Sequence, residues 1–225
     1  MRRTLVVTFV LLGLSAAAAS PAVAARMPLD EKIRLATEVY LELLEVEERE
    51  VPQALLDEAS CVAVIPGVIK GAFGWGGRHG RGVLSCRNNG SWSAPVFVTL
   101  SGGSFGLQIG AQSTDVVLFI VKERSVRSLL RSKFTLGGDL SVAAGPVGRS
   151  AELGTDIRLR AEIYSYAKSR GLFAGVSVEG ARLAPHRKSI DKYYGRSLSA
   201  EEILFGSAID ELPAESRDLI EALGR

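Results

Sequence analysis

Glycine recurs at short intervals in Gly71-Ala-Phe-Gly-Trp-Gly-Gly-Arg-His-Gly-Arg-Gly82, and this stretch decides the fold. It overlaps two candidate strands, 68–73 and 81–86, so the pattern predicts strand–loop–strand. A dinucleotide site needs G-x-G-x-x-G between a strand and a helix, and this segment lacks both the spacing and the helix. The glycines are therefore expected to let strands bend and pack closely.

Strand signals continue on both sides of this stretch. Cys61–Ile65 is a buried-type strand that Pro66-Gly67 is expected to end, and Asn88-Asn89-Gly90 predicts a hairpin turn because Asn and Gly tolerate positive φ. Residues 104–110 alternate between apolar and small or polar side chains. Further strands are expected over 92–100, 116–121, 140–144, 158–166 and 172–178.

Helical periodicity marks both ends of the chain. Residues 29–49 carry apolar positions at spacings of three and four, and shorter helices are expected over 52–59, 123–133, 187–193, 199–206 and 213–223. The combination predicts an α+β fold, in which a Gly-rich curled antiparallel sheet or barrel is flanked by N- and C-terminal helices. No linker or low-complexity tract interrupts residues 26–225, which are expected to form a single domain.

The first 25 residues have the pattern of a secretory signal peptide. Arg2-Arg3 precede the apolar run Leu5–Leu14, and an Ala-rich segment with Ala22-Val23-Ala24 fits a cleavage site. The run is too short for a transmembrane helix of about 20 residues, and no Cys lies near the cleavage site for a lipoprotein anchor. We expect a periplasmic or secreted protein.

Charge is distributed unevenly along the 225 residues, which contain 27 Lys+Arg and 25 Asp+Glu. Residues 26–60 have a net charge of −6, residues 61–200 of +11 and residues 201–225 of −5. Two interpretations stay open: acidic terminal helices neutralise a basic core, or the basic middle meets an anionic partner. The 47% hydrophobic and 23% charged content is that of a globular chain and not of a disordered or collagen-like one.

A basic helix is the first candidate for such a contact. In residues 122–134, Arg124, Arg127 and Arg131 fall on one stripe, with Lys133 nearby and apolar residues on another stripe. A basic amphipathic helix can rest on an anionic bilayer, whereas the alternative is a surface helix with a solvated Arg face. Nucleic acid is not expected as a partner, because aromatic residues do not alternate with the arginines as a stacking platform requires.

Residue patterns for catalysis and metal binding are weak. Gly102–Gly106 matches G-x-S-x-G around Ser104, but a strand pattern follows where a nucleophile elbow needs a helix. Nothing in the spacing connects His79 or His186 to Ser104, and Asp115 and Asp139 are expected to cap turns. Two His and two Cys rule out an all-cysteine zinc site in one chain. We therefore expect no enzyme, no catalytic residue, no metal and no cofactor.

The two cysteines, Cys61 and Cys86, lie at the edges of predicted strands. An exported protein can hold them as a disulfide, which would add on the order of 3 kcal/mol by closing a loop of about 25 residues. Two buried thiols are the alternative, since two cysteines alone do not define a geometry.

An ordered series of segments resembles the SYLF domain family, a family of lipid-binding domains that is also known as the actin-regulating region of yeast endocytic proteins. The segments are Ala63–Val68, Phe73–Leu84, Trp92–Phe97, Gly102–Gly110, Asp115–Ile120, Leu136–Gly148, Ser165–Val176 and Tyr193–Gly195. They cover a core of about residues 30–206. The resemblance is to a bacterial-type exported member.

The resemblance implies a non-enzymatic module that binds phosphoinositide or another anionic lipid. In eukaryotic members of the family, an amphipathic N-terminal helix and basic residues are implicated in lipid binding. The N-terminal helix region of this sequence is acidic. Lipid contact is therefore expected through the basic middle, first at Arg124, Arg127, Arg131 and Lys133 and second at Lys70, Arg78 and Arg81. Because of the export signal, actin is not expected as a partner. The alternative is an envelope structural protein that binds another protein.

Overall fold

The computed structural model describes residues 27–45, 51–131, 135–146, 160–169, 172–206 and 208–225, and at 72–75, 104–111, 131, 169 and 172 it describes the backbone only. The predicted signal peptide lies outside these ranges.

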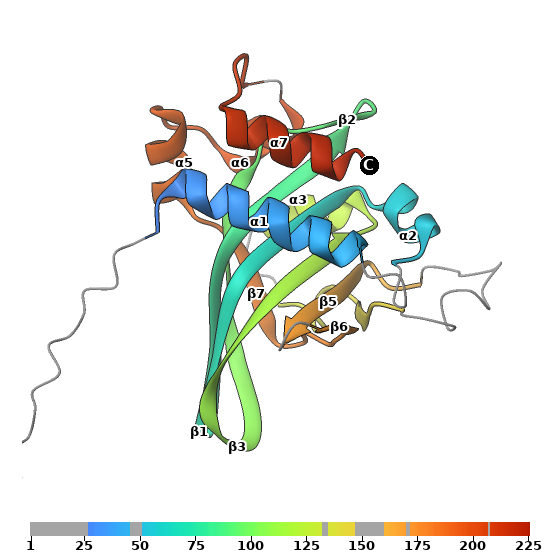
Figure 1. The fold of residues 1–225 in the computed structure, drawn as a ribbon, viewed down its shortest axis with the longest axis vertical. Coiled ribbons are helices and arrows are strands. Elements are labelled where there is room, and N and C mark those ends of the chain that lie inside the picture. Colours follow the sequence, from blue (N-terminus) through green and yellow to red (C-terminus); the bar gives the residue numbers. More distant parts are fainter. Residues whose placement is uncertain (1–26, 46–50, 132–134, 147–159, 170–171, 207) are drawn as a thin grey trace, which may run out of the picture.

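A long two-stranded antiparallel ribbon forms the centre of the fold. Strands β1 (Cys61–Asn88) and β3 (Val96–Ile120) pair continuously from Cys61↔Ile120 to Leu84↔Val96, with two register shifts. The ribbon extends away from the helices, turns around and comes back, so that each strand has an outgoing and a returning half (Figure 1). In β1 the outgoing half begins at Cys61 and the returning half ends at Asn88.

Glycine allows the two halves of β1 to touch. A Cβ placed on Gly82 would lie 2.0 Å from the carbonyl oxygen of Val64, and one on Gly80 would lie 2.7 Å from Cγ2 of Val68. Neither position has room for a side chain, because β1 packs against its own earlier residues there. The predicted role of the glycine-rich stretch in bending and close packing is confirmed.

Five short strands complete a curled half-barrel around the ribbon. They are β2 (Ser91–Trp92), β4 (Val142–Ala144), β5 (Ile163–Ser169), β6 (Leu172–Gly175) and β7 (Ala181–Pro185). The strand order is β2-β1-β3-β5-β4, with β6 on β5 and β7 on the returning half of the ribbon. The β4–β5 pair is parallel, so the sheet is mixed, whereas the sequence predicted an antiparallel one. The predicted α+β class and curled sheet are confirmed.

Helices gather at one end of the ribbon (Figure 1). Those before and within the sheet region are α1 (Leu29–Leu44), α2 (Gln53–Glu58) and α3 (Glu123–Arg131), and those that follow it are α5 (Arg187–Tyr194), α6 (Ala200–Phe205) and α7 (Ala214–Leu223). Helix α6 begins with a capping box, in which Ser199 and Glu202 satisfy each other's backbone N–H groups.

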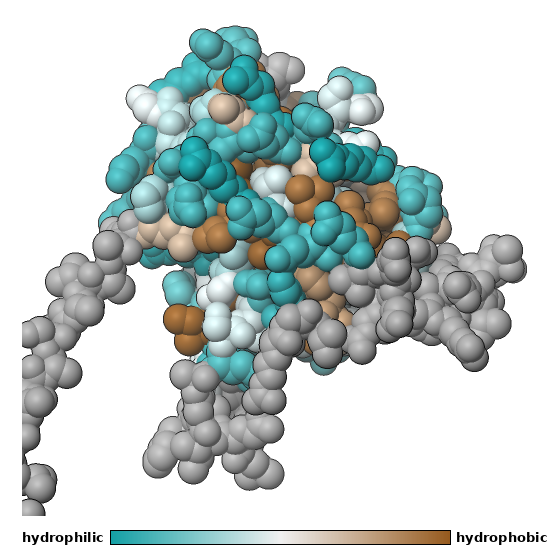
Figure 2. Space-filling model, in the orientation of Figure 1, coloured by the Kyte–Doolittle hydropathy of each residue, from teal (hydrophilic) through white to brown (hydrophobic). Residues whose placement is uncertain are grey.

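The apolar face of α1 is used in the core. Ile33, Ala36, Tyr40 and Leu43 are buried at spacings of three and four, and the helix packs on β1 and α7. On the side of the molecule that carries α1, hydrophilic residues dominate the surface over the helices (Figure 2). Helix α1 therefore has no free apolar face with which to enter a bilayer.

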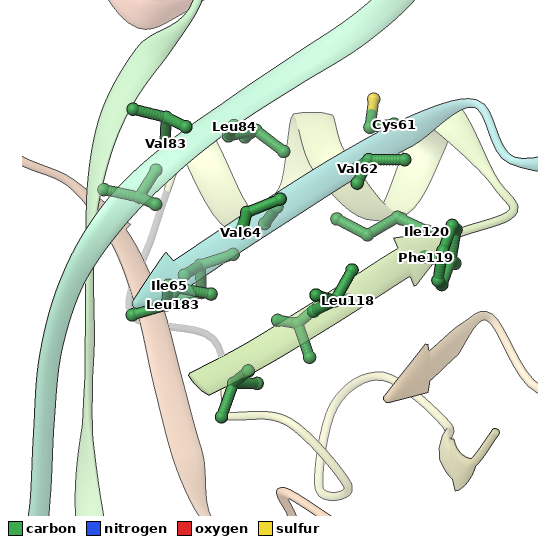
Figure 3. Packing of buried hydrophobic residues seen from close by; sticks show 14 of the residues in the cluster. Cys61, Val62, Val64, Ile65, Val83, Leu84, Leu118, Phe119, Ile120 and Leu183 are labelled. Carbon is green, nitrogen blue, oxygen red and sulfur yellow. The ribbon is translucent and has the colours of Figure 1, made fainter. Parts of the chain in front are cut away.

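Buried aliphatic and aromatic side chains fill the space between the ribbon and its covering elements. Val62, Val64 and Ile65 of β1 lie beside Leu118 and Ile120 of β3 (Figure 3), and all five are at most 2% exposed. Aromatic rings extend this core, because Phe119 packs edge-on against Tyr166 at 5.6 Å and lies 6.3 Å from Tyr40 of α1.

Cys61 and Cys86 form a disulfide, which joins the start of β1 to its returning half. Of the two alternatives that the sequence leaves open, the structure contains the bonded one. The bond reinforces the same fold-back that Gly80 and Gly82 permit.

Sequence-based boundaries differ from the observed ones mainly at Pro66-Gly67. The strand does not end there: the register shifts between Ile65 and Val68, and Gly67 has a φ of 61°, so a β-bulge carries the chain onward. The strands predicted over 61–65, 68–73 and 81–86 are consequently one strand, and those over 92–100, 104–110 and 116–121 merge largely into β3. Strand β7 was not predicted, because its five residues lie between Gly180 and His186 without a clear alternation.

The predicted hairpin turn is confirmed. Asn89 and Gly90 both have positive φ, at 50° and 86°, between the paired residues Asn88 and Ser91.

Candidate functional site

The arginines of α3 are paired with carboxylates. Arg124 lies 3.0 Å from Glu162 of the segment before β5. Arg127 contacts Glu123 at 2.7 Å and Glu201 of α6 at 2.9 Å, and its guanidinium stacks over Phe205 at 4.2 Å from the ring centre.

These contacts hold α3 against α6 and the sheet. The hydrogen bond to Glu123 is the main factor that raises the pKa of Arg127 above its ordinary value. The Arg131 side chain and Lys133, which belong to the same predicted site, lie outside the described part of the structure. The two described arginines of the predicted lipid-binding stripe therefore already have protein counter-charges.

The second predicted patch is divided by the sheet. The β1–β3 register pairs Arg78 with Gly102 and Arg81 with Thr99. Since side chains alternate along a strand, residues three apart lie on opposite faces. Arg78 faces the inside of the curled sheet with Lys70, whereas Arg81 lines a hollow on the outside.

The inner site is a groove of about 390 Å³ under the curl of the sheet. Apolar side chains from the ribbon, from β5 and β6 and from the segment after β6 form most of its wall: Val68, Leu100, Val116, Ala167, Ala174, Val176 and Val178. Lys70 and Arg78 are its cations, and Gln112, Thr114 and Ser177 add polar groups. Such a volume lies within the range of small-molecule sites, about 300–1,000 Å³.

Arg78 is the half-buried cation of this groove. One terminal nitrogen donates to the carbonyl oxygen of Glu179 at 3.4 Å, and burial lowers the pKa of its guanidinium. The buried Nε of Arg78 makes no hydrogen bond within the described ranges, and neither Lys70 nor Arg78 forms an ion pair with a described carboxylate. The groove therefore combines an apolar wall with uncompensated positive charge.

The outer hollow, of about 450 Å³, lies where α1, α5 and the returning half of the ribbon meet. Its cations are Lys32 of α1, Arg81 of β1, and Lys188 and Lys192 of α5. Of these, only Arg81 was predicted from the sequence. Lys32 belongs to a segment with net charge −6, so no local signal distinguished it, and Lys188 and Lys192 lie in the short helix predicted over 187–193.

Catalytic geometry is lacking where the sequence suggested looking for it. The Gly102–Gly106 match lies within β3, which continues as a strand, so the strand–turn–helix context of a nucleophile elbow is missing at Ser104. His186 shares a hydrogen bond of 2.7 Å with Ser189. Asp139 accepts from the Thr135 N–H at 2.9 Å, which confirms the turn-capping role predicted for it. Asp115 does not cap a turn: it lies within β3 and accepts from the Gly67 N–H at the bulge of β1, at 2.8 Å.

The described residues contain neither a metal-binding cluster of side chains nor a helix that could span a membrane. No group of three His, Cys, Asp or Glu side chains there could hold a metal ion. No helix in the same ranges is long and apolar enough to cross a membrane.

Comparison with known proteins identifies the family. Residues 101–225 match the Ysc84 family model, described as "Las17-binding protein actin regulator". The chain is 35% identical over 202 residues to human SH3 domain-containing YSC84-like protein 1, which covers 87% of this chain and 58% of that protein. The Xenopus laevis protein of the same name is 39% identical over 176 residues, covering 77% and 52%. Protein YSC84 of Saccharomyces cerevisiae is 39% identical over 160 residues, covering 69% of this chain and 34% of the yeast protein.

The chain belongs to the Ysc84, or SYLF, family, which confirms the resemblance seen in the sequence. It spans about half the length of the vertebrate relatives that it matches. The description of the family refers to actin regulation and Las17 binding, so it gives no support to the expectation that actin is not a partner.

Proposed function

We propose that this protein is a non-enzymatic module that binds an anionic phospholipid in the groove inside the curled sheet. The headgroup phosphate would contact Lys70 and Arg78, and an acyl chain would lie along the apolar wall. The observation that carries this proposal is a pair of cations, neither of which pairs with a described carboxylate, in an otherwise mainly apolar groove.

The chemistry of the groove fits an amphiphile better than a soluble ion. Lys70 is exposed and Arg78 is half-buried, so one cation meets solvent while the other belongs to the wall. A guanidinium can donate two parallel hydrogen bonds to a phosphate, and the free Nε of Arg78 adds a donor that the protein leaves unused. The apolar wall would take hydrocarbon out of water at about 25 cal/mol per Å² buried.

We further propose that the protein acts outside the cytoplasm, in the periplasm or after secretion. The signal-peptide pattern of residues 1–25 and the Cys61–Cys86 disulfide support this location.

Vesicle co-sedimentation tests the lipid function. We expect the purified protein to sediment with phosphatidylcholine vesicles that contain phosphatidylserine, less with phosphatidylcholine alone, and less at high salt. The double variant Lys70→Gln/Arg78→Gln should bind at least about tenfold more weakly, since one hydrogen bond to a charged group contributes about 1.5–3 kcal/mol.

The matched control is Arg124→Gln/Arg127→Gln, which removes the same charge from the ion-paired surface of α3. If both double variants lost vesicle binding equally, binding would depend on the net charge of the protein and not on the groove, which would contradict the proposal. Ala174→Trp adds a separate test: Ala174 is exposed and lines the groove, so a ring there should displace the acyl chain while both cations remain.

Binding to another protein is the second candidate function, and the description of the family as Las17-binding actin regulators favours it. Sedimentation of the protein with actin filaments, in the absence of vesicles, would support this candidate. If Lys70→Gln/Arg78→Gln left that sedimentation unchanged, the two functions would use different surfaces.

A further inference from the structure

A second group of cations converges in the outer hollow, on the face of the sheet opposite to the groove. Lys32 comes from α1, Arg81 from the returning half of β1, and Lys188 and Lys192 from successive turns of α5. The remaining wall is mainly apolar and includes Leu29, Phe97 and Val98. None of the described residues that line this hollow is a carboxylate.

Lys32, like Arg81, is a half-buried member of this group. Its ammonium contacts only uncharged atoms in the described structure: the carbonyl oxygen of Arg81 at 3.5 Å and the sulfur of Met27 at 3.8 Å. Burial, and then the charge of Arg81, lower the pKa of Lys32. A half-buried ammonium beside a guanidinium lowers the free energy of unfolding, and no described carboxylate offsets this effect.

The carboxylates that neighbour these lysines in the sequence do not pair with them. Asp30 and Glu31 precede Lys32 on α1, and Asp191 precedes Lys192 on α5. Among the described residues, none of the four cations of the hollow forms an ion pair. This contrasts with Arg34, which pairs with Glu31, and with Lys168, which pairs with Glu42.

The same face of the sheet holds further unused polar atoms. Thr99 lies directly opposite Arg81 in the register, and Arg182 pairs with Ser101 two residues further along β3, so these side chains share a face. The Oγ1 of Thr99 and the Nε of Arg182 are buried and make no hydrogen bond within the described structure. Positive charge and free hydrogen-bonding atoms thus extend from the hollow along the sheet.

We propose that the outer hollow is a binding site for a phosphate-bearing anion, with Lys32 and Arg81 as its inner contacts and Lys188 and Lys192 at its rim. Three ammonium groups and one guanidinium suit a multiply charged phosphate, whose oxygens accept charge-assisted hydrogen bonds from several directions. The site is separate from the groove of Lys70 and Arg78, so it can be tested independently of the proposed lipid function.

The experiment uses two probes that present this chemistry from different sources. Sodium tripolyphosphate supplies it in solution, and phosphatidylcholine vesicles that contain phosphatidylinositol 4-phosphate supply it on a membrane. We expect tripolyphosphate to raise the melting temperature relative to sodium chloride of equal ionic strength, because a ligand that binds only the folded state stabilises it. If vesicles bind and tripolyphosphate does not, the phosphate is that of a lipid headgroup; if only tripolyphosphate binds, it is a soluble one. Binding of neither probe would overturn the proposal.

Variants distinguish this site from the groove. Lys32→Gln and the surface variant Lys188→Gln/Lys192→Gln should each weaken binding of the effective probe about tenfold. The second variant changes only exposed residues of α5, so it keeps the test valid if Lys32→Gln fails to fold. Lys70→Gln/Arg78→Gln should leave tripolyphosphate binding unchanged. Equal affinities of the wild type and both hollow variants would show that the anion binds elsewhere.

Discussion

The surface of α3 and the outer hollow both carry positive charge, but they differ in whether that charge is paired with carboxylates. On α3, Arg124 and Arg127 each contact at least one carboxylate within 3.0 Å. In the hollow, the hydrogen-bond acceptors of the Lys32 ammonium among the described residues are a carbonyl oxygen and a sulfur, and the charge that acts on its pKa is another cation. The α3 arginines therefore have counter-charges within the protein, whereas no described carboxylate pairs with Lys32.

This difference shows that a basic stripe in a sequence does not reveal which of its charges are paired within the protein. An arginine that is matched by carboxylates contributes to packing between elements, and an added anion would have to compete with those partners. A cation that is half-buried without a partner lowers stability and gains most from an anion. The two regions are therefore expected to respond in opposite ways to the removal of charge.

The largest effect is expected from a change that closes the space between the halves of the ribbon. Gly82→Ala would place a Cβ 2.0 Å from a backbone oxygen of Val64, which cannot move away as a flexible side chain could. We expect a loss of about 3 kcal/mol or more in the free energy of unfolding, measured by urea denaturation. The hollow would lose its shape, since Arg81 is the neighbouring residue.

Gly71→Ala is the matched control for this change, because Gly71 lies in the same strand and a Cβ there would meet no atom within 4 Å. Its unfolding free energy should stay within about 0.5 kcal/mol of the wild type. Similar stabilities for the two variants would contradict the contact between the halves of β1.

A moderate effect is expected on α3. Arg127→Gln removes the ion pairs to Glu123 and Glu201 and the stacking on Phe205. We expect the melting temperature to decrease by at most a few degrees, with tripolyphosphate binding unchanged. A loss of anion binding without a change in melting temperature would reverse the comparison and place the ligand on α3.

The smallest effect on stability is expected at Lys32, where substitution should stabilise the protein and not destabilise it. Its pKa is lower in the folded state than the ordinary value of 10.5, so the unfolded chain binds more protons between these two values. The free energy of unfolding therefore rises with pH in that window. Lys32→Gln should remove this pH-dependent contribution and slightly raise the melting temperature at neutral pH without ligand.

Arg34→Gln serves as the control for Lys32→Gln, since Arg34 is exposed on the same helix and pairs with Glu31. It should change neither the pH dependence nor anion binding. Destabilisation by Lys32→Gln at neutral pH would mean that Lys32 has a stabilising partner. The cations of the hollow would then be compensated within the protein, as those of α3 are.

Local patterns in the sequence were sufficient for much of the fold. Apolar spacing located α5, α6 and α7 to within a few residues and the start of α1 at Leu29, while residues 46–49 of the predicted first helix lie outside the described ranges. Asn89-Gly90 specified the hairpin turn through its positive φ angles. Predicted breaks were less dependable, because Pro66-Gly67 forms a bulge whose backbone is held by Asp115, 48 residues later in the chain. A contact of that separation leaves no local trace.

The sequence by itself determined that this is an α+β chain of the SYLF family, with a bending glycine-rich segment and a basic middle between acidic ends. These properties are local or compositional, so they can be counted along the chain. Only the tertiary structure decided which charges meet. Alternation along β1 puts Arg78 and Arg81 on opposite faces of the sheet. The packing of α3 against α6 and the segment before β5 gives its arginines Glu201 and Glu162, and the packing of α1 on β1 brings Lys32 from an acidic helix beside Arg81. Charge pairing acts over a few ångströms, and those distances are set by how the ribbon folds and not by sequence separation.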